Sequence, residues 1–204
     1  SALMWRDSNT ILYLADRGVV STLGEIIFDG TELRERVSRE GGLVFDGLDY
    51  SYSDGAIVTR LQSPRHPPEV AVLDMASKEP TRLTNSNPWL EEIRFAPQEV
   101  VSYKARDGLE IEGVLIRPLE DTEQRAPLIF VVHGWPESHV RDGWLSTYSR
   151  LGQTAAALGM AVFYPNYRGS TGRTVAYSKL HHGDPAGKEF DDLVDAVEYF
   201  VDLG

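Results

Sequence analysis

The stretch that decides the fold is "PLIFVVHGWPESH", which runs from Pro127 to His139. Its first half is a continuous apolar run of mostly β-forming residues, which is typical of a strand buried on both faces of a sheet. The run stops abruptly at His133-Gly134, and the chain then turns through Trp135-Pro136 into polar sequence. The sequence therefore predicts a buried strand that ends in a His-Gly corner.

The flanking segments predict the other elements of the same sheet. Upstream, "VVSYKARDGLEIEGVLIRP" alternates on both sides of Arg106-Asp107-Gly108, which predicts a strand pair joined by a turn. Downstream, "MAVFYPNYRGSTG" predicts a second buried strand that leads into a Gly-rich loop. Between the two buried strands, "DGWLSTYSRLGQTAAALG" predicts a helix that ends at Gly159, with an apolar face made of Leu145, Tyr148, Leu151, Ala155 and Leu158.

The last segment, "KEFDDLVDAVEYFVDLG", predicts a helix whose apolar face consists of Phe190, Leu193, Val194, Val197 and Phe200. The order strand, helix, strand, helix requires right-handed crossovers onto a parallel sheet. We therefore assign residues 96–204 to an α/β domain and expect a further parallel strand to follow Gly204.

Residues 1–95 follow a different pattern of short strands with frequent turns. "GEIIFDGTELRERVS", for example, predicts two strands joined by an Asp29-Gly30 turn, and "PEVAVLDMASKEPTRLT" has the strand, turn and polar strand of a propeller blade. Because blades span ~40–45 residues, this half amounts to about two blades of a β-propeller. A small independent β-sandwich is the alternative interpretation.

Composition excludes several classes of function. The net charge of -11 argues against nucleic-acid binding, which depends on clustered Lys and Arg. Without cysteine there is no disulfide, no zinc-thiolate site and no Cys nucleophile, which fits a reducing compartment and leads us to expect a cytoplasmic protein. No apolar run approaches the ~20 residues of a membrane helix. The spacing of the five histidines suits no metal, so we predict no metal and no cofactor.

The sequence also lacks the motif that carries a nucleophilic serine in α/β folds. The nucleophile-elbow pattern G-x-S-x-G does not occur, and Ser170 is rejected because Arg168 stands where the first glycine is needed. His181 and His182 precede any elbow, so we interpret them as loop residues.

Four segments together resemble the prolyl oligopeptidase family of serine peptidases, especially its acylaminoacyl-peptidase and dipeptidyl-peptidase-like branches. They are "PQEVVSYKARDGLEIEGVLIRP", "PLIFVVHGWPESH", "MAVFYPNYRGSTGR" and "GKEFDDLVDAVEYF". The resemblance covers about residues 95–204 and implies a β-propeller ahead of an α/β-hydrolase domain. It also implies that this chain, which does not begin with Met, is an internal piece of a longer peptidase.

The resemblance suggests roles for two loops. His133, Gly134 and Trp135 resemble the oxyanion loop, in which backbone N–H groups stabilise the negative charge on the substrate carbonyl. Tyr167 and Arg168 belong to a possible substrate-site loop. The alternatives are that Arg168 locks its loop through an ion pair with an acid such as Asp191, and that Tyr167 only packs.

The expected function is hydrolysis of short peptides through an acyl-enzyme, with the Ser, Asp and His of the triad all after Gly204. Residues 1–204 alone should be inactive, and the remainder of the polypeptide should be present physically, possibly as a separate chain. The alternatives are a carboxylesterase of the same fold and a non-catalytic binding protein. Because esterases often carry His-Gly-Gly-Gly, the His-Gly-Trp-Pro loop favours a peptidase. Glu91-Glu92 resembles an acidic pair that grips a substrate amino terminus, although a solvated charge pair explains it equally.

Overall fold

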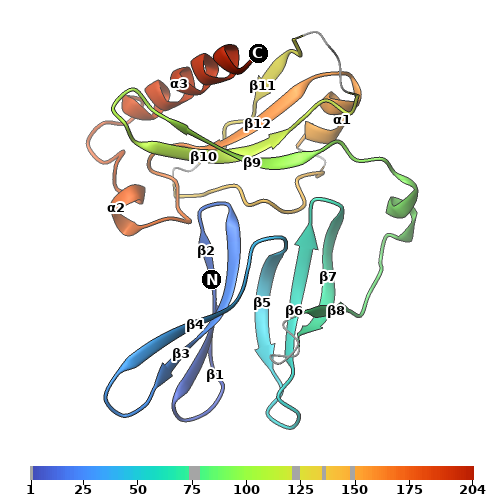
Figure 1. Cartoon of the computed structure of the whole chain (residues 1–204), viewed down its shortest axis with the longest axis vertical. Coiled ribbons are helices and arrows are strands. Elements are labelled where there is room, and N and C mark those ends of the chain that lie inside the picture. The colour runs from blue at the N-terminus through green and yellow to red at the C-terminus, as the bar shows by residue number, and fades with distance from the viewer. Residues whose placement is uncertain (1, 74–78, 121–124, 135–136, 148–149) are drawn as a thin grey trace. The chain divides into compact units, whose positions relative to one another are not determined.

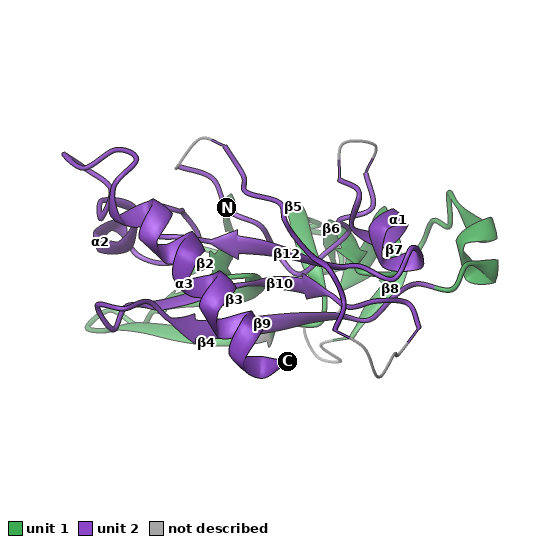
Figure 2. Cartoon of the chain, turned by 90° about the horizontal axis from the view of Figure 1, so that it is seen from above, with its two compact units in different colours: residues 1–94 green, residues 95–204 purple. Residues whose placement is uncertain are grey.

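A computed structural model describes residues 2–73, 79–120, 125–134, 137–147 and 150–204. The chain separates into two compact units, residues 1–94 and residues 95–204 (Figure 2). Trp135 and Tyr148 of the predicted elements lie outside the described residues.

The first unit contains two four-stranded antiparallel sheets, each connected in chain order (Figure 1). The first sheet comprises β1 (Ala2–Trp5), β2 (Thr10–Arg17), β3 (Val20–Phe28) and β4 (Leu33–Glu40). The second comprises β5 (Val44–Tyr50), β6 (Ile57–Ser63), β7 (His66–Leu73) and β8 (Pro80–Arg82). Propeller blades are four-stranded sheets of this kind. A short 3₁₀ helix, η1 (Pro88–Glu92), follows them.

The two sheets share one hydrophobic core, formed by Leu12, Leu14, Leu23, Phe45, Ile57, Leu61, Ala71 and Leu73. The predicted turn at Asp29-Gly30 lies between β3 and β4. One carboxylate is also buried: Glu25 on β3 is fully enclosed and is paired with Arg6 and Arg36. A buried charge is tolerated when it is paired in this way, so the ion pairs allow a glutamate inside the first unit.

The second unit is built on a sheet with the order β11-β12-β10-β9. Its strands are β9 (Gln98–Lys104), β10 (Glu110–Ile116), β11 (Leu128–Phe130) and β12 (Ala161–Asn166). The predicted sheet is parallel, but among the described strands only β11 and β12 run parallel. The reason is the β9–β10 hairpin, because its second strand, β10, pairs with β12 in the antiparallel direction.

The helix between β11 and β12 is shorter than the sequence predicts. The described helix α1 covers only Gly152–Ala157, and Gly159, whose φ of 83° is left-handed, follows its C-cap as the predicted stop. Before it, the Asn166 side chain bonds both the N–H and the carbonyl of Val140, at 2.7 and 2.8 Å. Within the predicted segment, the Gln98 side chain donates to the Asp142 carboxylate and to the Gly143 carbonyl at 2.7 and 3.0 Å, and the described residues 142–147 and 150–151 form no helix.

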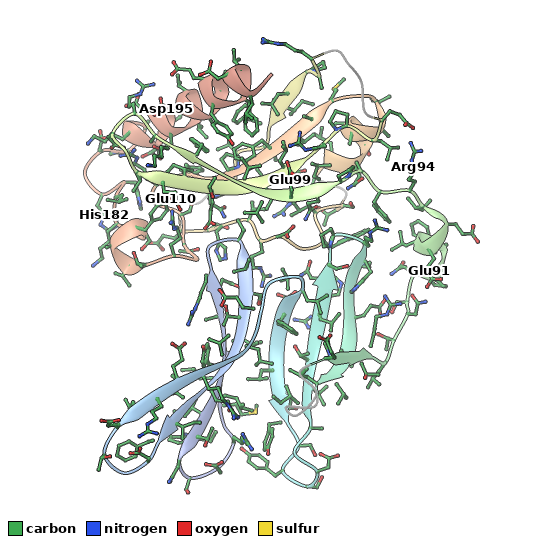
Figure 3. All side chains as sticks on the ribbon, in the orientation of Figure 1. Glu91, Arg94, Glu99, Glu110, His182 and Asp195 are labelled. Carbon is green, nitrogen blue, oxygen red and sulfur yellow. The ribbon has the colours of Figure 1, made fainter. Side chains whose placement is uncertain are left out.

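The last helix, α3 (Lys188–Leu203), forms as predicted but buries a different face. Phe200 packs against the core of the sheet, whereas Phe190, Val194 and Val197 are about half exposed at 56, 49 and 45%. The helix instead buries Ala196 together with Asp192 and Asp195, the latter labelled in Figure 3. Arginines of other elements pair with both aspartates, so ion pairs allow these two carboxylates to lie on the buried face.

None of the helices in the described ranges combines the length and the apolar character that crossing a membrane would require.

Candidate functional site

The candidate site lies where β11 and β12 end. The two strands are parallel neighbours, so their carboxyl ends meet at one edge of the sheet. The chain continues from β11 to His133-Gly134, and from β12 to residues 167–171. Open α/β sheets bind ligands outside the carboxyl ends of their strands, so this edge is where a site is expected.

The loop after β12 holds His133 through three contacts. The imidazole stacks on the Tyr167 ring, with centroids 4.7 Å apart and planes inclined by 20°. The Tyr167 hydroxyl donates to the His133 carbonyl oxygen at 2.7 Å. His133 Nε2 lies 3.1 Å from Ser170 Oγ. The two loops that the sequence singled out are therefore joined directly.

Burial lowers the pKa of the His133 imidazole, which favours its neutral form. Its Nδ1 lies 3.3 Å from the Gly134 carbonyl oxygen, which can only accept, so Nδ1 carries the proton. Nε2 is then the acceptor, and the Ser170 hydroxyl donates to it. Burial and the nearby Glu189 charge raise the pKa of Tyr167, so its hydroxyl stays protonated and remains a donor.

Gly134 itself is open to solvent. Among the described residues, a Cβ built on it would meet no heavy atom within 4 Å. Within the part of the chain that the structure describes, no backbone acceptor engages the Gly134 N–H. Trp135, the third residue of the predicted oxyanion loop, lies outside the described residues.

The same loop is tied down again further along. Asn166 holds Val140, the Thr171 N–H donates to the Ser138 carbonyl at 3.0 Å, and His139 Nδ1 lies 2.9 Å from Thr171 Oγ1. The sequence did not single out these partners. The polar residues that follow a buried strand were the available signal, but it did not identify which atoms they reach.

Arg168 is buried, at 4% exposure, and two carboxylates engage its guanidinium. It donates to Asp192 from Nε and Nη2 and to Asp107 from Nη1 and Nη2, at distances from 2.6 to 3.1 Å. Asp192 and Asp107 raise the pKa of Arg168. The suggested partner Asp191 was wrong, since it lies 3.3 Å from Arg106. The contacts favour the locking role over a substrate contact.

Ser170 is fully buried, although its contact with His133 resembles a serine–histidine pair. A nucleophile must reach the substrate, so burial argues against that role in addition to the missing elbow. His181 lies against Gly169, where an added Cβ would come within 2.5 Å of His181 Nδ1. His182 is exposed after α2 (Val175–Ser178) (Figure 3).

Glu91, from the acidic pair singled out in the sequence, is exposed on η1 (Figure 3). Its carboxylate accepts from the Asn85 side chain at 3.2 Å. No group of three or more His, Asp or Glu side chains suited to a metal ion occurs among the described residues.

Comparisons with known proteins identify the fold. Residues 146–204 match the family model described as "Prolyl oligopeptidase family". The chain is 33% identical over 143 residues to "Uncharacterized peptidase YuxL" of Bacillus subtilis, which covers 69% of the chain and 21% of that relative. It is 34% identical over 131 residues to "Dipeptidyl aminopeptidase BIII" of Pseudoxanthomonas mexicana, covering 61% of the chain and 18% of that relative. The chain thus spans about a fifth of these curated relatives.

Among solved structures, the acylaminoacyl peptidase of Pyrococcus horikoshii superposes with a TM-score of 0.81 at 22% identity. The match covers 100% of this chain and 31% of that chain. The fold is therefore that of β-propeller blades followed by the opening part of an α/β-hydrolase sheet, and the predicted fold class is confirmed.

Proposed function

We propose that this chain, which belongs to the prolyl oligopeptidase family, supplies the oxyanion loop of a serine peptidase that acts on short peptides. The observation that carries the proposal is the geometry of the β11 edge. His133 is held from three sides, and the adjoining Gly134 is open. A rigid backbone N–H beside an unobstructed space is what a developing oxyanion requires.

The proposed reaction places the attacking group outside these residues. A serine hydroxyl attacks the peptide carbonyl and passes its proton to a histidine, and the carbonyl oxygen becomes negative. A backbone N–H of the His133-Gly134 corner donates to that oxygen. The C–N bond then breaks, the histidine returns the proton to the leaving amine, and water hydrolyses the acyl-enzyme. The names of the two relatives, a peptidase and a dipeptidyl aminopeptidase, support peptide substrates.

The test is Gly134→Ala in the full-length protein. Because an added Cβ meets no atom of the described part of the chain within 4 Å, the melting temperature should stay unchanged. The same Cβ stands where the substrate carbonyl must approach the backbone, so kcat/KM for a peptidyl anilide should fall by about tenfold or more. An unchanged kcat/KM would contradict the assignment of the loop.

Labelling by a fluorophosphonate probe separates the proposal from its alternatives. A serine peptidase is labelled and cleaves peptidyl anilides, whereas a carboxylesterase is labelled and prefers p-nitrophenyl esters. A non-catalytic binding protein is not labelled at all. We also expect the protein in the cytoplasm, because it contains no cysteine, and fractionation of cells would check this.

A further inference from the structure

The Tyr167 hydroxyl binds the peptide unit that carries the Gly134 N–H. It donates to the His133 carbonyl oxygen at 2.7 Å. That oxygen and the Gly134 N–H belong to the same planar peptide unit, and in a trans peptide they point in opposite directions. Holding the oxygen against the Tyr167 hydroxyl therefore turns the Gly134 N–H away from that hydroxyl, and among the described residues no backbone acceptor engages this N–H.

Ser170 fixes the other half of the same residue. Its hydroxyl donates to His133 Nε2 at 3.1 Å, while the imidazole is stacked on the Tyr167 ring. Ser170 is fully buried and Tyr167 is 8% exposed, so both side chains lie among packed neighbours. The ring and the carbonyl of His133 are thus held at once, by two residues of one loop.

The loop that follows β12, residues 167–171, is itself anchored. Arg168 lies between Tyr167 and Ser170 in the chain. It is bound to Asp192 on α3 and to Asp107 in the β9–β10 turn. The Arg168 N–H also donates to Asp192 Oδ2 at 2.8 Å. The loop therefore presents Tyr167 and Ser170 from a fixed frame.

We infer that Tyr167 and Ser170 are positioning residues, which clamp His133 so that the Gly134 N–H points at the oxyanion. This inference rests on the proposed function and adds to it two residues that need not touch the substrate. Their effect should appear in the transition state, where the oxyanion forms, and only weakly in substrate binding.

The experiment compares Tyr167→Phe with wild type in the full-length protein. The variant keeps the stacked ring and removes only the hydroxyl, so kcat for a peptidyl anilide should fall about tenfold while KM changes less than about twofold. Tyr13→Phe is the matched control: Tyr13 is 5% exposed against 8% for Tyr167, and its hydroxyl donates to the Glu35 carboxylate within residues 1–94. It should lower the melting temperature to a similar extent and leave kcat unchanged.

Ser170→Ala keeps the inference testable if Tyr167→Phe fails to fold, and it should also lower kcat with KM unchanged. A normal kcat in either folded variant, or an equal loss of kcat in Tyr13→Phe, would overturn the positioning role. A wild-type protein that neither cleaves anilides nor reacts with fluorophosphonate would instead overturn the proposed function, and the positioning role with it.

Discussion

At the scale of single residues, Arg168 illustrates how one side chain can link three elements. Its guanidinium and backbone N–H contact Asp192 on α3, and its Nη atoms contact Asp107 in the β9–β10 turn. Removing one partner of such a buried pair leaves an uncompensated charge, which typically costs ~3–5 kcal/mol. Arg168 therefore stabilises the second unit as well as the candidate site.

Asp107→Asn tests this link through its pH dependence. Hydrogen bonds from Arg168 lower the pKa of Asp107 from 3.8 to about 2. Because the folded pKa is depressed, the stabilisation is complete above about pH 4 and is lost as the pH falls toward 2. At pH 6 the free energy of unfolding of the variant should be lower than that of wild type by about 1 kcal/mol or less, since the carboxylate is 40% exposed, and this difference should shrink as the pH falls through about 2.

Urea denaturation of the full-length protein at several pH values would measure that gap. Glu110→Gln is the control, because Glu110 is 61% exposed and lies 3.7 Å from Arg173 (Figure 3). The difference in free energy of unfolding between Glu110→Gln and wild type should stay small at every pH. A gap for Asp107→Asn that does not depend on pH would show that Arg168 does not need the charge.

At the scale of elements, the close packing of β10 against β12 depends on a glycine. Gly113 pairs in register with Pro165, and a Cβ on it would lie 2.5 Å from the Tyr164 carbonyl oxygen and 2.6 Å from the Phe163 ring. Its φ lies outside the left-handed region, so the glycine is needed for space and not for backbone conformation.

Gly113→Ala should therefore destabilise the second unit by about 1–3 kcal/mol, although alanine is ordinarily favoured over glycine in a strand. The ladder fixes the backbone oxygen that the new methyl group would contact. Thermal denaturation of the full-length protein measures the effect. Ser102→Ala, at an exposed position of β9 in the same hairpin, should melt like wild type. A melting temperature of Gly113→Ala equal to that of Ser102→Ala would contradict the tight contact.

At the scale of the whole molecule, the chain consists of two units with separate cores. The core of residues 1–94 draws on both antiparallel sheets, and the core of residues 95–204 on the mixed sheet, α2 and α3. Each core is formed from residues of its own unit. We therefore propose that the boundary behaves as a linker, as the predicted division into residues 1–95 and 96–204 implies.

Brief trypsin digestion of the full-length protein tests this. Arg94 is exposed after η1 (Figure 3), so cleavage after Arg94 should be early, whereas cleavage after the buried Arg168 should be late. Arg94→Gln should abolish the early cut, which mass spectrometry of the fragments would report. Early cleavage after Arg168 would contradict the rigid frame around the candidate site.

The sequence by itself determined the strands of the second unit, the Asp29-Gly30 turn and the placement of His133-Gly134 after a buried strand. These features follow from local signals, namely apolar runs, alternation and turn residues. Only the tertiary structure decided the mixed sheet, the short α1, the buried aspartates of α3 and the choice of Asp192 over Asp191. Those outcomes depend on which distant side chains the strand register brings within hydrogen-bonding distance, and local periodicity carries no information about that distance.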